Sequence, residues 1–157
     1  MTNWREYLDP RPIVLVTSVD AAGKPNVFTV AWSMPTSFDP ALLAISAGHQ
    51  RYSHELIAEC GEFVVNVPDR TLKDLALQVG GISGRKADKF AKFRIATQPA
   101  QRVKPPVIAD CLAAIECVVV DSLLTGDHTI FIGRVAAAYP LQPTFDPHEV
   151  LMQGMYG

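Results

Sequence analysis

The sequence Asn26-Val27-Phe28-Thr29-Val30-Ala31-Trp32, followed by Ser37-Phe38-Asp39-Pro40, has the pattern of a buried strand that then breaks at a proline. It carries small hydroxyl and amide side chains where a plain core strand would carry Val, Ile or Leu. A strand with small polar side chains lets a flat polar ligand lie against its backbone. The pattern therefore predicts a strand over 26–32 and raises the hypothesis that this strand is one wall of a binding site.

Five further segments have the composition of strands. Residues 13–19 are β-branched and apolar, as in a strand buried on both faces, and the turn formers of 20–25 connect them to 26–32 as an antiparallel hairpin. The remaining four segments are 42–47, 63–67, 113–121 and 128–135, the last two joined by the turn Thr125-Gly126-Asp127. Most of these connections have the length of hairpin loops, which favours an antiparallel sheet.

Helical spacing is confined to three short segments. Leu56, Ile57 and Cys60 share one face after Ser53, which fits an N-cap, and Gly61 ends the pattern. A second helix is predicted over 71–79, where Thr71 and Asp74 resemble a capping box, and a third through 88–90. Residues 97–110 are marked by prolines and are expected to be irregular.

The order of these elements predicts the fold class. Strands outnumber helices, the two do not alternate regularly, and no GxGxxG motif opens a helix, which disfavours a doubly wound parallel sheet. We expect one domain over residues 1–157, mainly β, in which an antiparallel barrel or sandwich carries a few peripheral helices.

The composition excludes several classes of function. Hydrophobic residues make up 48% and charged residues 19% of the 157 residues, and the formal net charge of −2 offers no electrostatic footprint for nucleic acid. No apolar stretch is long enough for a membrane span, and the N-terminal residues lack the order of a signal peptide. We therefore expect no membrane association and a cytoplasmic location.

The cysteines and histidines do not follow a metal-binding pattern. Cys60, Cys111 and Cys117 are odd in number and have no CxxC spacing, which favours buried free thiols over a disulfide framework. The four histidines show no HExxH or similar spacing. The sequence therefore predicts no metal site.

Three clusters of small polar or basic residues are candidates for ligand binding: the first at 26–33, the second at 46–54 and the third at 83–90. The second cluster runs from a strand end into a helix start, where free N–H groups, the cation of Arg51 and the hydroxyl of Ser53 suit a phosphate. An ordinary serine cap beside a solvated arginine explains the same pattern and is the commoner case. Arg85 and Lys89 could likewise hold a phosphate, but on the pattern alone solvent-facing charges are the favoured interpretation.

Nucleophilic catalysis has no clear candidate. The chain contains no GxSxG motif, and no cysteine stands in an evidently basic setting. His128 follows Asp127 at the start of a predicted strand and is a candidate general acid or ligand contact, although a turn histidine without a role fits equally well.

In order from about residue 11 to 139, the chain closely resembles the flavin reductase-like, FMN-binding split-barrel family, and most of all its flavoredoxin-type branch. The segments that carry the resemblance are Arg11–Asp20, Gly23–Val27, Thr29–Trp32, Ser37–Pro40, Arg51–Ile57, Glu62–Pro68, Ser83–Arg85, Asp88–Phe90 and Gly126–Val135. No single motif is diagnostic, but the ordered series is highly specific. The C-terminal segment, Phe145–Gly157, follows the family only loosely.

This resemblance implies a split β-barrel, a homodimer and FMN bound near the dimer interface. The residues that it places along the flavin ring and ribityl chain are Thr29, Val30, Ala31, Trp32, Ser33, Ser46, Ala47 and Gly48. At the phosphate it implies Arg51, Ser53, Ser83, Arg85 and Lys89, and it brings His128 near the ring or the nicotinamide. Because the flavin itself accepts hydride, the lack of a catalytic triad or dyad is expected of such a protein.

Three hypotheses about function follow. The leading one is an NAD(P)H-dependent flavin (FMN) reductase, with NADH or NADPH as donor and a partner oxygenase or a small electron acceptor as recipient. The second is an FMN-binding electron-transfer protein that takes its electrons from a protein donor. The third, a binding barrel without a cofactor, is disfavoured by the intact polar clusters.

Overall fold

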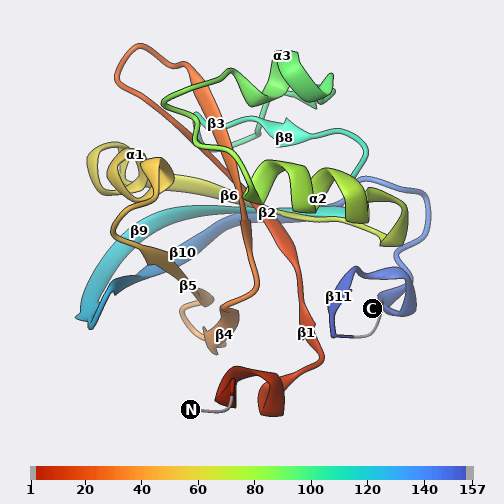
Figure 1. Ribbon diagram of the computed structural model, residues 1–157, viewed down its shortest axis with the longest axis horizontal. Helices are drawn as coiled ribbons and strands as arrows, with labels where there is room; N and C mark the ends of the chain where they lie inside the picture. Colours follow the sequence, from red (N-terminus) through yellow and green to blue (C-terminus); the bar gives the residue numbers. More distant parts are fainter. Residues whose placement is uncertain (1–2, 155–157) are drawn as a thin grey trace.

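The computed structural model describes residues 3–154, and its centre is one seven-stranded sheet (Figure 1). Its strands are β2 (Val14–Val19), β3 (Pro25–Val30), β4 (Ser33–Ser37), β5 (Leu42–Gly48), β6 (Glu62–Val67), β9 (Ala113–Thr125) and β10 (His128–Pro140). They lie in the order β3-β2-β6-β9-β10-β5-β4, and every neighbouring pair is antiparallel. The predictions of an antiparallel, mainly β fold and of the hairpin at 13–32 are confirmed.

The sheet curls, and one short chain crossing joins its two edge strands. β3 and β4 are the edge strands, yet only Ala31 and Trp32 separate them in the chain. Three steps of extended chain cover at most about 11 Å, so Val30 and Ser33 must lie close together. The N–H of Ser46 in β5 donates to the carbonyl of Trp32 at 2.9 Å and fixes this crossing. The fold is therefore an antiparallel split barrel, and residues 31–32 bridge its split.

Two layers of apolar side chains explain why β2 is buried along its whole length. Val14 and Val16 face the barrel interior, where they pack with Phe63. Leu15 faces the other way and packs with Val79. Interior packing also fixes one helix, because Ile57 belongs to the interior cluster. The sequence pattern of 13–19 predicted this burial on both faces, and the structure confirms it.

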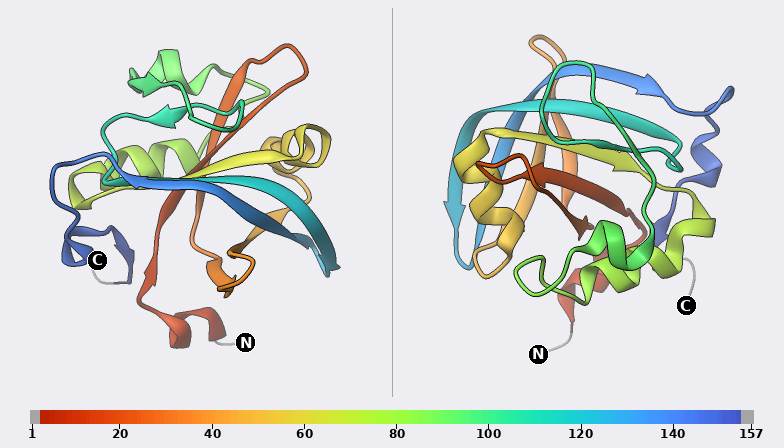
Figure 2. Two further views of the ribbon diagram at one scale, coloured as in Figure 1. Left: turned by 180° about the vertical axis from the view of Figure 1, so that it is seen from behind. Right: turned by 90° about the horizontal axis from the view of Figure 1, so that it is seen from above.

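The helices lie outside the barrel. They are α1 (Tyr52–Cys60), α2 (Lys73–Gly80) and α3 (Lys89–Phe93), with the 3₁₀ helices η1 (Trp4–Leu8), η2 (Arg70–Leu72) and η3 (Pro147–Glu149). Figure 2 shows α2 and α3 on one side of the strands and the long β9–β10 hairpin on the other. Two short sheets complete the fold, β1 (Arg11–Pro12) with β11 (Met152–Gln153) and β7 (Thr97–Gln98) with β8 (Val107–Ile108). None of the helices in residues 3–154 has the length and apolar character that crossing a bilayer requires.

Several element boundaries differ from the prediction. The strand predicted over 26–32 ends at Val30, and the chain then starts β4, which the sequence did not reveal because Pro35 interrupts its pattern. A proline is tolerated there because β4 is an edge strand. Strands β9 and β10 run on to Thr125 and Pro140, and the irregular segment 97–110 contains β7 and β8.

Two predicted helix caps are wrong. Arg51, in extended conformation, occupies the N-cap of α1, while Ser53 lies inside the helix and accepts a hydrogen bond from Asn26 Nδ2 at 2.8 Å. The capping box at Thr71 is replaced by Asp69, whose Oδ1 accepts from the Thr71 N–H at 2.9 Å and so caps η2. Ser53 therefore bonds to a residue that is distant in the sequence, and Thr71 bonds to Asp69, two residues before it.

Gly133 lies at a β-bulge of β10, against the interior. A Cβ at this position would lie 2.6 Å from Phe63 Cζ and 2.7 Å from Cys117 Cβ. We expect Gly133→Ala to lower the free energy of unfolding by about 1–3 kcal/mol, because buried groups must move to admit the methyl. Urea unfolding measures this, with Gly81→Ala as control, since its methyl would make ordinary contacts at 3.5 Å. Equal losses in the two variants would contradict the prediction.

Candidate functional site

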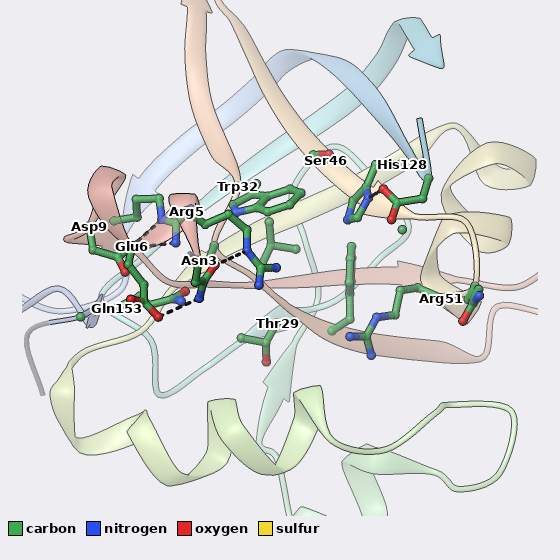
Figure 3. A pocket seen from close by; sticks show the side chains of 18 of the residues that line it. Asn3, Arg5, Glu6, Asp9, Thr29, Trp32, Ser46, Arg51, His128 and Gln153 are labelled. Atoms are coloured by element: carbon green, nitrogen blue, oxygen red, sulfur yellow. Dashed lines mark hydrogen bonds and ion pairs between the residues drawn. The ribbon is translucent and has the colours of Figure 1, made fainter. Parts of the chain in front are cut away.

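A wide hollow opens at the split of the barrel (Figure 3). It has a volume of about 920 Å³ and is called the main pocket below. The end of β3 and the crossing at residues 31–32 form one wall, and β5 and the turn before α1 form another. Of the residues that the sequence assigned to a ligand, it gathers Thr29, Val30, Ala31, Trp32, Ser46, Gly48, Arg51 and His128.

A second, smaller hollow of about 80 Å³ adjoins the main pocket and is called the recess below. The two share Thr29 and Arg51, among others. The residues found only in the recess include Asn26, Ser53, Ser83, Gly84 and Lys89. A Cβ at Gly84 would lie 2.7 Å from Asn26 Cγ, so glycine allows the 83–85 loop to close against β3. Four of the five predicted phosphate residues, Arg51, Ser53, Ser83 and Lys89, therefore lie together at one small, polar hollow.

The recess holds two cations with little compensation. Lys89 is only 4% exposed, and its Nζ donates to the carbonyls of Val27 at 2.7 Å and Val79 at 3.0 Å. Burial, and secondly the charge of Arg51, lower the pKa of Lys89 to about 8. Arg51 donates from Nη1 to the carbonyl of Gly80 at 3.3 Å. In residues 3–154 neither cation has a carboxylate within ion-pair distance. An anion in the recess would offset both charges.

Three predicted site residues lie apart from the two hollows. Arg85 forms an ion pair with Glu55 and stands 5.0 Å from the ring centre of Tyr52. Ala47 is fully buried in the interior cluster. Ser33 lines a third, more apolar hollow of about 470 Å³, called the apolar hollow below. Their assignments to a cofactor stay predictions.

His128 is held in place at the mouth of the main pocket (Figure 3). Its Nδ1 lies 2.6 Å from Asp127 Oδ1, and its ring centre lies 4.8 Å from that of Trp32, with the planes 37° apart. The hydrogen bond, and secondly the charge of His128, lower the pKa of Asp127. The same pair of rings lines the apolar hollow, so it stands between the two hollows.

The N-terminal segment adds pocket residues that the sequence did not reveal. Asn3, Arg5 and Glu6 of η1 and its flank line the main pocket opposite Arg51 (Figure 3). Pairing of β1 with β11 brings in Gln153 as well. Neither segment has a local signal, because these residues become neighbours of β3 only through long-range pairing. No three His, Cys, Asp or Glu side chains within the described range gather as a metal site.

The sequence comparison gives the family of the chain. Residues 8–155 match the model of the flavin reductase like domain, so the chain belongs to the flavin reductase-like family. An uncharacterized protein of Archaeoglobus fulgidus is 44% identical over 136 residues, which are 86% of this chain and 75% of that protein. A probable flavin reductase of Rhizobium meliloti is 33% identical over 127 residues, 80% of this chain and 38% of that protein.

Two further similarities concern flavin proteins by name. An NADH:riboflavin 5'-phosphate oxidoreductase of Streptomyces pristinaespiralis is 27% identical over 122 residues, 78% of this chain and 66% of that protein. Among solved structures, the flavoredoxin of Desulfovibrio vulgaris is 29% identical, with a TM-score of 0.78 over 83% of this chain and 70% of that one. The chain spans between 49% and 75% of the length of the first four curated relatives.

Proposed function

We propose that this protein is an FMN-binding oxidoreductase that takes electrons from NADH or NADPH. It passes them through the flavin to a small acceptor or a partner oxygenase. The observation that carries the proposal is the pair of cations at the recess, the buried Lys89 and the exposed Arg51, neither of which has a carboxylate partner in residues 3–154. Burial of the Lys89 charge costs free energy unless an anion offsets it.

The dimensions of the two hollows support FMN in particular. The main pocket has the volume of a site for a flat cofactor, whereas the recess has room for little more than one phosphate group. A bound flavin would accept a hydride at N5, with negative charge developing toward N1 and its neighbouring carbonyl. The chain would bind the phosphate at the recess and place the ring against the backbone of residues 29–32 and 46–48.

His128 is proposed as a contact for the nicotinamide or the flavin ring. Asp127 holds its Nδ1, so its Nε2 faces the neighbourhood of Gly48, where an added Cβ would lie 3.5 Å away. The contact with Trp32 keeps the imidazole at the boundary of the main pocket. This arrangement orients a polar group at the pocket without making it a nucleophile.

Stopped-flow mixing tests the proposed function. Protein loaded with FMN and mixed anaerobically with NADH or NADPH should lose its flavin absorbance near 450 nm in a single turnover. Free FMN at the same concentration is the control, because it reacts with neither nucleotide at a useful rate. If neither nucleotide bleaches the bound flavin, the reductase proposal is wrong.

A second candidate function is an FMN-binding electron carrier that receives electrons from a protein donor. The similarity in fold and sequence to a flavoredoxin favours it. A small ferredoxin-type donor would then reduce the flavin, and neither nicotinamide nucleotide would. The same stopped-flow experiment, with the donor replaced, separates the two candidates.

We also propose a homodimer, on the basis of exposed apolar side chains. Phe38, next to β4, is fully exposed, and Met34 in β4 is 61% exposed. Leu123 and Leu124, at the far end of β9, are also exposed. Exposed large apolar side chains are frequent at interfaces between subunits. Sedimentation velocity, which distinguishes a monomer of 17.1 kDa from a dimer, measures this directly.

A further inference from the structure

Two histidines share one hydroxyl beside the main pocket. Thr129, buried in β10, places its Oγ1 3.1 Å from His49 Nε2 and 2.9 Å from His54 Nε2. The two imidazole rings meet edge to face, with their centres 5.2 Å apart. His49 belongs to the turn before α1 and lines the main pocket, whereas His54 lies within α1 and packs against Phe131. One hydroxyl thus connects a pocket residue to a histidine outside the pocket.

The count of hydrogens restricts these two bonds, because Thr129 can donate at most one of them. A hydroxyl has one hydrogen and two acceptor lone pairs, and a neutral imidazole has one donor and one acceptor nitrogen. Thr129 can therefore donate to only one of the two Nε2 atoms, and the other must donate to Oγ1. When His49 Nε2 accepts, its own proton resides on Nδ1, and His54 carries its proton on Nε2.

The surroundings disfavour the charged form of His54. Burial, and secondly the charge of His49, lower the pKa of His54, while Glu55 of the same helix opposes this. From the β9–β10 turn, the backbone carbonyl of Asp127 accepts from the backbone N–H of His49 at 3.0 Å, and the Asp127 carboxylate holds His128. Two protonated rings at this separation would repel each other. The arrangement therefore suits a neutral histidine pair joined through the hydroxyl of Thr129.

We propose that His54, Thr129 and His49 form a proton relay that ends at the main pocket. His49 gives up its Nδ1 proton to a group in the pocket and takes the hydroxyl proton of Thr129 on Nε2. Thr129 takes the Nε2 proton of His54, and His54 regains one from solvent at Nδ1. One bond to hydrogen breaks and one forms at every step, so the number of protons is conserved. This inference rests on the proposed function, since hydride transfer to a flavin is followed by uptake of a proton.

The first test uses the protein without any cofactor. Long-range ¹H–¹⁵N spectra distinguish Nδ1–H from Nε2–H imidazoles, and they should show opposite tautomers for His49 and His54. Thr129→Val removes the hydroxyl while keeping the shape and a high strand propensity. It should abolish the opposite tautomers, and Thr129→Ser should restore them. If the spectra of Thr129→Val match those of the parent, the relay is wrong.

The second test uses the flavin-loaded protein. Because general acid catalysis contributes about 10²–10⁴-fold, Thr129→Val should slow the proton-dependent phase of flavin reduction by at least about tenfold. Added imidazole should recover part of this loss, and Thr129→Ser should react within about twofold of the parent. His54→Gln retains a donor near Oγ1 but cannot pass a proton, so it should lose the same phase.

The two proposals fail separately. If neither nicotinamide nucleotide reduces the flavin, the proposed function is wrong, and the tautomers measured without flavin still confirm or contradict the shared hydroxyl. If the flavin is reduced at the parent rate in both Thr129→Val and His54→Gln at every pH, the relay is wrong and the proposed function stands.

Discussion

Replacing Arg51 and Lys89 together by alanine is expected to raise the dissociation constant of FMN by about 10²–10³-fold. Each hydrogen bond to a charged group contributes about 1.5–3 kcal/mol when its partner is desolvated, and the two cations lie at the same recess. Because neither has a carboxylate in the described structure, the phosphate would be their main counter-charge. Quenching of FMN fluorescence measures the dissociation constant.

Riboflavin, which lacks the phosphate, makes this experiment specific. The dissociation constant of riboflavin should change by less than about threefold in the same double variant, because the ring contacts persist. Lys92→Ala is the matched control, since Lys92 lies on the same helix as Lys89 and is exposed. If FMN and riboflavin weaken equally, Arg51 and Lys89 do not bind the phosphate.

Lys89 has a structural role that must be separated from binding. Its Nζ joins the carbonyls of Val27 in β3 and Val79 in α2, so alanine removes two hydrogen bonds along with the charge. Unfolding by urea, carried out on Lys89→Met and Lys89→Ala, reports this loss. A variant that unfolds at the parent midpoint but binds FMN weakly assigns the effect to the phosphate.

The stability of the protein and its affinity for FMN should change in opposite directions as the pH rises. The pKa of Lys89 is lowered from 10.5 to about 8, so the native protein binds fewer protons than the unfolded chain between pH 8 and 10.5. This group therefore adds stability as the pH rises through that window. Affinity for FMN should fall over the same window, because Lys89 loses the charge that attracts the phosphate. Lys89→Met should remove both trends.

The strands could be predicted because their patterns are local. The apolar segment 13–19 and the turn after it indicate a hairpin whatever the rest of the chain does. The helix caps could not be predicted in this way, because more than one nearby side chain could make the same short-range hydrogen bond. Ser53 looks like a cap by spacing, yet Asn26 in β3, distant in sequence, donates to its hydroxyl. That competition depends on how α1 packs against β3, which no local pattern contains.

Some residues of the candidate site could be predicted from the sequence, and others could not. Arg51, Ser53 and Lys89 could be proposed from the sequence because a helix start with basic neighbours suits an anion. The contribution of η1 could not, since Asn3 and Arg5 reach the main pocket only after β1 pairs with β11. The sharing of Thr129 by His49 and His54 also arises from tertiary structure, because 75 residues or more separate the threonine from each histidine.

Glu116 is expected to be among the residues that contribute most to stability. It does not line the recess. It is fully buried in β9, and its carboxylate accepts three hydrogen bonds. The donors are the N–H groups of Gln101 at 2.7 Å and Arg102 at 2.6 Å and the hydroxyl of Tyr139 at 2.6 Å. These bonds attach the 99–106 loop to the sheet and compensate for burial of the charge.

Glu116→Gln is expected to lower the free energy of unfolding by about 2–4 kcal/mol. The amide places an NH₂ group against a backbone donor, so at least one buried N–H loses its acceptor, which costs about 1–3 kcal/mol, and the charge-assisted bonds weaken as well. Tyr139→Phe removes one donor and leaves the carboxylate with two, so its loss should be nearer 1 kcal/mol.

Glu62→Gln is the matched control, because Glu62 accepts from the Lys104 N–H at 2.8 Å in a solvent-exposed setting and water can replace that bond. Urea unfolding at pH 7 should therefore rank Glu116→Gln well below Tyr139→Phe and Glu62→Gln. If all three unfold at the same midpoint, the carboxylate does not hold the loop, and the burial of Glu116 needs another explanation.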